Sequence, residues 1–407
     1  MKTVAIRMAP TPTVRTEIQN APSESTLFSW RLRRITSGGA WIAELDGLRF
    51  VAIVSVVLYH INAQLLVKSG HAVPIQSRYD LLFTALGNGD RGVRLFFVIS
   101  GFVLGLGFAR QHLQRARPVN LKKYFLRRVT RLEPPYIFNL VFCALTAFVY
   151  YHQAVSAMLP HLLASIFYLH NVAYRTPSLI NAVTWSLEVE IQFYILAPLI
   201  SMLFRISSVW LRRSVFLLLI ALIGVLQMEF RVGATLGALT ILFYLQYFLA
   251  GLLLTDLYLT EGPRFQNHWQ WDVLSVCGWP LIFLIPANFL WYHELLPFLI
   301  LPLYIAAFKG ILFRTFFRST WIATIGGMCY SIYLWHFFVI GVFFKITRHW
   351  VIFHDFLLNL IVQVTGLGIP IAAVSVLVFV LIERPCMDPA WPQKLRAFLL
   401  GRPKIDS

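Results

Sequence analysis

Residues 44–64 read ELDGLRFVAIVSVVLYHINAQ, and the rest of the chain is organised around this stretch. Two acids and an arginine are followed by about ten apolar residues, after which a histidine stands at a depth where lipid is expected. Arg49 and His60 are eleven positions apart, and eleven helical steps of about 100° return to within about 20° of the starting direction. The spacing therefore predicts one helix that carries both side chains on the same face, about 16 Å apart along its axis.

Two interpretations of this pair are possible. Arg49 could extend to the membrane surface while His60 is satisfied inside a helix bundle. However, ionisable groups at membrane depth are costly to bury and usually functional. We therefore favour a functional site, with Arg49 near one membrane surface and His60 near the midplane.

The composition is that of a membrane protein. Of 407 residues, 58% are hydrophobic and only 13% are charged, and the mean hydropathy is +0.68. A soluble domain of this length would contain far more charge. The net charge of +17 is concentrated in loops beside apolar segments, which indicates the positive-inside pattern and not a nucleic-acid-binding face.

The apolar segments predict an all-α polytopic membrane protein of about ten transmembrane helices. The predicted spans are residues 47–66, 92–109, 135–152, 187–204, 214–229, 236–257, 273–290, 296–312, 321–344 and 357–382. The seventh and eighth contain prolines. The apolar segment 156–170 is too short to cross and is interpreted as re-entrant or interfacial.

Lysines and arginines are concentrated in alternate loops, including eight between residues 110 and 131. By the positive-inside rule this asymmetry predicts that both termini are cytoplasmic. We expect a disordered tail over 1–40, a transmembrane domain over 41–388 and a cytoplasmic C-terminal tail over 389–407. The four cysteines have no metal-ligand spacing and imply no disulfide framework, so no metal is expected. Nothing in the sequence specifies an oligomeric state.

Residues 121–136 read LKKYFLRRVTRLEPPY and predict a cationic helix on the cytoplasmic membrane surface, which Pro134 and Pro135 would end. Arg127 and Arg131 lie at i and i+4 on one face, and Arg128 is their neighbour. The row could be only a topology signal held by anionic lipid. It could also be a phosphate clamp, because guanidinium groups suit a polyphosphate ligand.

Two further motifs hold acids and a second histidine. Residues 184–194 read TWSLEVEIQFY, where Glu188 and Glu190 are two positions apart, so at most one should point inward. Residues 326–338 read GGMCYSIYLWHFF, with His336 well inside a predicted span. His60, Glu190 and His336 are thus expected in the middle or outer half of the membrane, opposite the cytoplasmic arginines.

Six motifs in this order resemble the acyltransferase type three family of integral-membrane proteins over residues 41–388. They are LDGLR at 45–49, GVRLFFVISGF at 92–102, RRVTRLEPPY at 127–136, WSLEVEIQFY at 185–194, CYSIYLWH at 329–336 and IERP at 382–385. The resemblance implies transfer of an acyl group, usually acetyl from acetyl-CoA, to a hydroxyl of an extracytoplasmic sugar or lipid-linked glycan. It also implies that Arg49 and His60 are essential and that Arg127 and Arg131 bind the donor. The family glutamate corresponds to Glu190, and the role of Glu188 stays open.

The sequence therefore predicts an O-acyltransferase of the bacterial inner membrane. Its donor would be an acyl-CoA and its acceptor a glycan or lipid-linked sugar, with no nucleic-acid partner. His60 would act as general base or carry the acyl group covalently. The alternative is a proton-coupled polysaccharide or lipid transporter that uses the same histidines.

Overall fold

The computed structural model describes residues 32, 34–35, 41–68, 75–230, 232, 238–262, 266–286 and 291–400, and in this part every regular element is a helix. The longer helices are α2 (Ala43–Lys68), α4 (Arg91–Leu113), α5 (Leu121–Val149), α8 (Trp185–Ile200), α9 (Val209–Glu229), α10 (Ile241–Thr260), α12 (Tyr292–Lys309), α15 (Cys329–Thr347) and α16 (Phe356–Val378). The shorter ones are α3 (Asp80–Gly87), α6 (Val155–Ile166), α7 (His170–Tyr174), α11 (Gln270–Leu284), α13 (Leu312–Arg318), α14 (Thr320–Gly327), α17 (Arg384–Cys386) and α18 (Trp391–Leu399).

Eight helical segments in the described ranges are long and apolar enough to cross a membrane, or nine if a bent pair counts as one span. The differences from the predicted ten lie at the seventh and eighth predicted spans. The predicted span 273–290 is the 15-residue helix α11, which contains Pro280 and reaches only about 22 Å. The predicted span 296–312 falls in α12 and α13, which meet at an angle of 83°. The short segment 156–170 forms α6, a helix of 12 residues.

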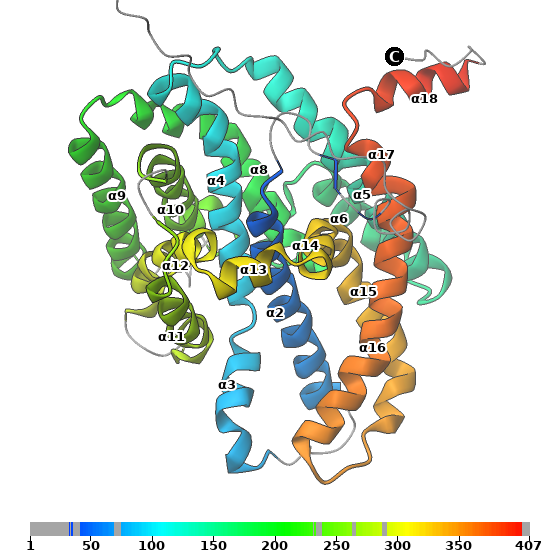
Figure 1. Ribbon diagram of the computed structural model, residues 1–407. Coiled ribbons are helices and arrows are strands. Elements are labelled where there is room, and N and C mark those ends of the chain that lie inside the picture. Colours follow the sequence, from blue (N-terminus) through cyan, green and yellow to red (C-terminus); the bar gives the residue numbers. More distant parts are fainter. Residues whose placement is uncertain are drawn as a thin grey trace, which may run out of the picture.

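Helix α2 lies at the centre of the molecule, between the α4–α13 side and the α15–α16 side (Figure 1). Its residues contribute to three separate apolar clusters, the third of which contains Leu65 near the end of the helix. Leu45, Leu48 and Ala52 pack in the larger cluster, with α4, α8, α10 and α12. Ile53 and Ile61 pack in the second, with α15 and α16. The stretch that carries Arg49 and His60 therefore lies at the interface between two groups of helices.

Glycines fix the start of α2 against its neighbours. A Cβ atom at Gly47 would collide with the backbone of Phe317 in α13, and one at Gly326 in α14 would collide with the carbonyl of Asp46. Only glycine permits such close helix contacts. The glycine of the LDGLR motif thus has a packing role, and it holds Asp46 and Arg49 in a fixed position.

Helix α5 differs from the prediction that Pro134 and Pro135 separate a surface helix from the third span. Both prolines lie inside one continuous helix of 29 residues. A proline leaves the carbonyl four residues earlier without its helical donor. Pro134 has no N–H to donate to the carbonyl of Thr130, and this carbonyl instead accepts a hydrogen bond of 2.8 Å from the Trp391 indole of α18. A tertiary contact thus compensates for the lost helical bond.

Parts of both predicted tails contact the transmembrane domain. In the segment 1–40 the structure describes Leu32, Arg34 and Ile35, and the remainder lies outside the described residues. Leu32 is buried in the cluster formed by α2, α15 and α16, and Ile35 packs against it. In the second tail, Trp391 is the residue that bonds to α5.

The start of α3 and the start of α5 lie at opposite ends of the molecule (Figure 1), which allows a direct test of the predicted orientation. In a variant without native cysteines, Ile75→Cys should react with a membrane-impermeant thiol reagent added to intact cells. Arg117→Cys should react only after the membrane is opened, because its loop carries the excess of positive charge. Labelling of position 117 in intact cells would reverse the orientation and contradict cytoplasmic termini.

Candidate active site

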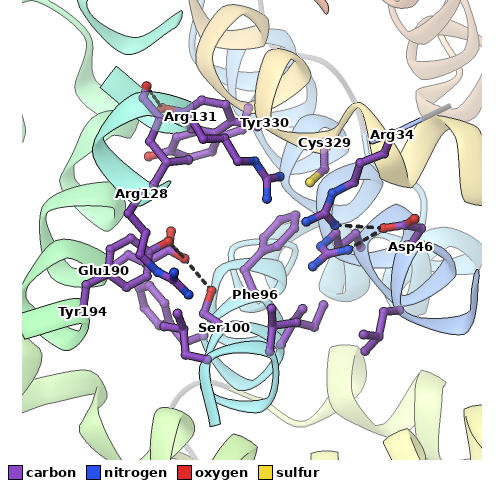
Figure 2. Close-up of a pocket in the computed structure, with 18 of the residues that line it drawn as sticks. Arg34, Asp46, Phe96, Ser100, Arg128, Arg131, Glu190, Tyr194, Cys329 and Tyr330 are labelled. Atoms are coloured by element: carbon purple, nitrogen blue, oxygen red, sulfur yellow. Dashed lines mark hydrogen bonds and ion pairs between the residues drawn. The ribbon is translucent and has the colours of Figure 1, made fainter. Parts of the chain in front are cut away.

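A polar cavity of about 490 Å³ opens among α2, α4, α5, α8 and α15. This volume is typical of sites for small molecules and cofactors. Six arginines and two carboxylates line it: Arg34, Arg49, Arg110, Arg127, Arg128, Arg131, Asp46 and Glu190. We call it the arginine cavity, and Figure 2 shows the side chains at its centre.

The cations of the arginine cavity outnumber their protein partners. The ion pairs recorded there join Asp46 to Arg34, at 3.4 Å, and to Arg49. Among the described residues, neither Arg127 nor Arg131 has an ion-pair partner. Both are half-buried, and cations partly removed from water favour an anionic partner, so the cavity is suited to a polyanionic ligand.

Helix α5 turns its arginine row inward. Leu121, Phe125 and Val129 are exposed on the outside of the molecule, whereas Arg127 and Arg131 line the arginine cavity. On α5 these apolar side chains therefore lie on the outer side and Arg127 and Arg131 on the cavity side, while Lys122 and Lys123 at its start are exposed. A helix in contact with lipid is expected to show this reversed polarity, because lipid replaces water outside it. That this part of the helix lies on the cytoplasmic membrane surface stays a prediction.

Asp46 is the central acceptor at one side of the cavity. It is buried and lies one turn before Arg49 on α2, in the first turn of the helix. Besides the two arginines it accepts a hydrogen bond of 2.8 Å from the indole of Trp41. These contacts hold Arg49 at the cavity wall. The sequence analysis did not select Asp46, although its spacing of three residues from Arg49 was a usable signal.

Glu190 and Arg128 lie on the opposite wall. The carboxylate of Glu190 accepts hydrogen bonds from Ser100, at 2.5 Å, and from the Tyr194 hydroxyl, at 2.6 Å. The guanidinium of Arg128 stacks over the ring of Tyr124, 4.0 Å from its centroid. Aromatic stacking stabilises the cation without neutralising it, so Arg128 still contributes positive charge to the cavity.

Glu188 points away from the cavity, in agreement with the expected opposite directions of the two acids. Its side chain is fully buried, and one oxygen accepts a hydrogen bond of 2.8 Å from the backbone of Asn171 in α7. Asn171 in turn donates to the carbonyl of Trp185 at 2.8 Å. Glu188 therefore helps to hold α7 against α8, while Glu190 faces the cavity.

The two predicted histidines are neighbours. The rings of His60 and His336 lie 5.2 Å apart between centroids. His336 is fully buried, and its Nδ1 lies 2.8 Å and 3.0 Å from the carbonyls of Tyr333 and Ile332. These acceptors require a proton on Nδ1, so Nε2 carries a free lone pair. Nε2 is buried and has no partner in the described structure.

The histidine pair lies beyond the lining of the arginine cavity. The nearest lining residues along the chain are Val56 on α2 and Tyr333 on α15, each about one helical turn before a histidine. The structure thus brings Arg49, Glu190 and the three α5 arginines to one cavity. It places His60 on α2 and His336 on α15 next to each other, one helical turn beyond the last cavity-lining residues of these two helices.

Arg34 is a further functional candidate that sequence reasoning missed, as it missed Asp46. It lines the arginine cavity, but it belongs to the segment interpreted as a disordered tail, where no periodic pattern marks it. Burial, together with the nearby charges of Arg131 and Arg49, lowers the pKa of Arg34 to about 9. In the described ranges, no group of three or more His, Cys, Asp or Glu side chains is arranged to hold a metal ion.

The fold and cavity define a multi-pass helical membrane protein with a cationic site inside its bundle. A family profile described as an acyltransferase domain matches residues 42–382. The chain therefore belongs to this acyltransferase family, and the membership predicted from its motifs is confirmed. This membership supports the predicted transferase and favours it over the transporter alternative.

Two relatives carry more specific names. The chain is 25% identical over 329 residues to O-acetyltransferase OatA of Staphylococcus aureus, covering 74% of this chain and 51% of the relative. It is 24% identical over 349 residues to peptidoglycan O-acetyltransferase OatA of Listeria monocytogenes, covering 74% and 49%. The chain thus spans about half the length of these curated relatives. No solved structure matches it significantly.

Proposed function

We propose that this chain is an O-acyltransferase of the bacterial inner membrane that moves an acyl group, acetyl from acetyl-CoA, to a hydroxyl of a cell-surface or lipid-linked glycan. The observation that carries the proposal is the arginine cavity, in which guanidiniums without ion-pair partners lie beside α2, the helix that continues to His60 and its neighbour, the buried His336. The names of the two OatA relatives support the O-acetyl and glycan parts of the proposal.

The donor would bind by its phosphates to Arg127, Arg131 and Arg128. These groups suit phosphate oxygens, because guanidiniums form charge-assisted hydrogen bonds with them. Arg49 would lie closer to the thioester, because it lines the cavity on α2, the helix that also carries His60. Binding from the cytoplasmic side leaves the opposite side free for the acceptor.

His60 would act on the acceptor hydroxyl. As general base it takes the hydroxyl proton while the oxygen attacks the thioester carbonyl, and the coenzyme A thiolate leaves and is then protonated. As nucleophile it would first take the acyl group on nitrogen and then pass it to the hydroxyl. Glu190 lies on the cavity side of this path, and His336 adjoins His60.

The proposal is tested with purified protein and acetyl-CoA carrying a labelled acetyl group. We expect binding and slow hydrolysis of the thioester, because water can replace the acceptor. Glycans of cells with and without the protein should then differ by the mass of acetyl groups. A protein that neither binds nor hydrolyses acetyl-CoA, while moving a glycan in response to a proton gradient, would support the transporter instead.

Replacing Arg127 and Arg131 together by glutamine should raise the apparent KM for acetyl-CoA at least about tenfold. Each charge-assisted phosphate contact contributes about 1.5–3 kcal/mol. The matched control is Lys122→Gln with Lys123→Gln, which removes the same charge from exposed positions on the same helix. If the two double variants have equal KM values in properly inserted protein, the arginine row serves only in topology.

A further inference from the structure

We propose that Arg34 belongs to the phosphate-binding site of the donor and acts together with Arg131 from the other side of the arginine cavity. This inference rests on the proposed use of coenzyme A thioesters. It adds a binding residue from outside residues 42–382, the range matched by the family profile.

The first observation is the position of Arg34. Its side chain is only 14% exposed and lines the arginine cavity. Figure 2 shows the guanidinium groups of Arg34 and Arg131 directed toward the same part of the cavity from opposite sides. The preceding residue in the described structure, Leu32, is buried in the apolar cluster of α2, α15 and α16, so the packing of this segment holds Arg34 in place.

The second observation is the balance of charge around it. Arg34 shares the carboxylate of Asp46 with Arg49, and the contact to Arg34 is the longer of the two. Its Nε is buried and has no hydrogen-bond partner in the described structure. Arg131, across the cavity, has no ion-pair partner there. The buried carboxyl group of Glu383 interacts electrostatically with both arginines, so Asp46 and Glu383 offset part of the positive charge of this region. A bound anion between Arg34 and Arg131 would offset the remainder.

The excess of positive charge also affects the pKa of Arg34. Burial and the charges of Arg131 and Arg49 lower its pKa to about 9, although an arginine ordinarily stays charged at far higher pH. An anion bound between Arg34 and Arg131 would remove this penalty. An anionic ligand suits this place, because Arg34, Arg49 and Arg131 outnumber the two carboxyl groups of Asp46 and Glu383.

Phosphate groups meet this requirement, and two sources could supply them. Coenzyme A carries a diphosphate and a further phosphate on its ribose, whereas the membrane offers anionic lipid headgroups. The cavity favours the coenzyme, because Arg34 faces the same space as the α5 arginines and lies within the bundle. An anionic lipid at Arg34 is therefore an outcome that the experiment must distinguish.

The test measures binding of coenzyme A and of pantetheine, which lacks every phosphate, to protein purified in neutral detergent. Arg34→Gln should weaken coenzyme A binding about tenfold or more and leave pantetheine binding unchanged. Arg318→Gln is the matched control, since Arg318 lies 3.8 Å from Glu44 near the same end of α2 and outside the cavity lining. Arg34→Lys should restore part of the affinity by retaining the charge.

The outcomes separate this inference from the proposed function. If the unaltered protein binds pantetheine as tightly as coenzyme A, the proposed donor site itself is wrong. If it prefers coenzyme A but Arg34→Gln binds both as before, only the role of Arg34 is overturned. The same holds if Arg34→Gln changes the binding of phosphatidylglycerol vesicles alone, which would assign Arg34 to lipid. Equal weakening of both ligands would indicate a disturbed fold and also contradict the inference.

Discussion

His60→Gln is expected to reduce acyl transfer by about 10²–10⁴-fold, the usual contribution of a positioned general acid–base group. Glutamine keeps the approximate size and hydrogen-bonding capacity of histidine but cannot usefully accept a proton. Because the lost group acts only in the chemical step, kcat should fall while donor affinity stays unchanged. Single-turnover rates with acetyl-CoA and a separate binding measurement would check both parts.

The matched control is His349→Gln, which makes the same exchange at an exposed histidine in the 3-10 turn that follows α15, Arg348–Trp350. Its rate should equal that of the unaltered protein. If His60→Gln retained more than about a tenth of the rate, the expected contribution of a general base would be missing. His60 would then have a structural role, and His336 would be the better candidate for the base.

The relative direction of side chains on one helix was predictable, because helical geometry alone decides it. The eleven-residue spacing of Arg49 and His60 placed both on one side of α2, and Arg49 indeed lines the cavity. The spacing of Arg127 and Arg131 likewise placed them on one face of α5. The sequence also separated Glu188 from Glu190. Each inference used a period within one helix, which a sequence contains completely.

The direction in which a helix face points was harder to predict from the sequence. The spacing of apolar and basic residues over 121–132 predicted a cationic helix on the membrane surface, but it did not indicate which structure the arginines would face. In α5 the apolar side is outside, so Arg127 and Arg131 face the cavity. The continuity of the helix through Pro134 depends on the indole of Trp391, more than 250 positions away. Such a contact has no local pattern in the sequence.

Arg34 shows the same limit more strongly. Nothing in its neighbourhood is periodic, and composition alone indicates disorder. Its contribution to the cavity depends on Asp46, twelve positions away, and on Arg131, which comes from another helix. The charge balance of a site assembled from five helices and a preceding segment is a tertiary property, so it becomes visible only when the helices are placed together.

The second large effect is expected at His336. Its Nδ1 donates to backbone carbonyls of its own helix, which leaves Nε2 as a buried acceptor beside the ring of His60. We expect Nε2 to accept a proton from His60 during the reaction or to fix which nitrogen of His60 carries the proton. His336→Asn retains a donor near the position of Nδ1 but has no atom that replaces Nε2. Its kcat should fall about 10–100-fold with little change in KM.

A double-mutant cycle distinguishes this positioning role from packing. If His336 acts through His60, the His336→Asn exchange should cost little further activity in the His60→Gln background, because residues that act as one unit give strongly non-additive losses. If His336 only fills space in the bundle, the two losses should multiply, and the melting temperature of His336→Asn should fall together with its activity. His336→Gln, which places its amide nearer to the position of Nε2, should then be no better than asparagine. A positioning role predicts instead that His336→Gln is more active than His336→Asn. The glutamine amide can still contact His60, whereas asparagine leaves that side of the His60 ring without a partner.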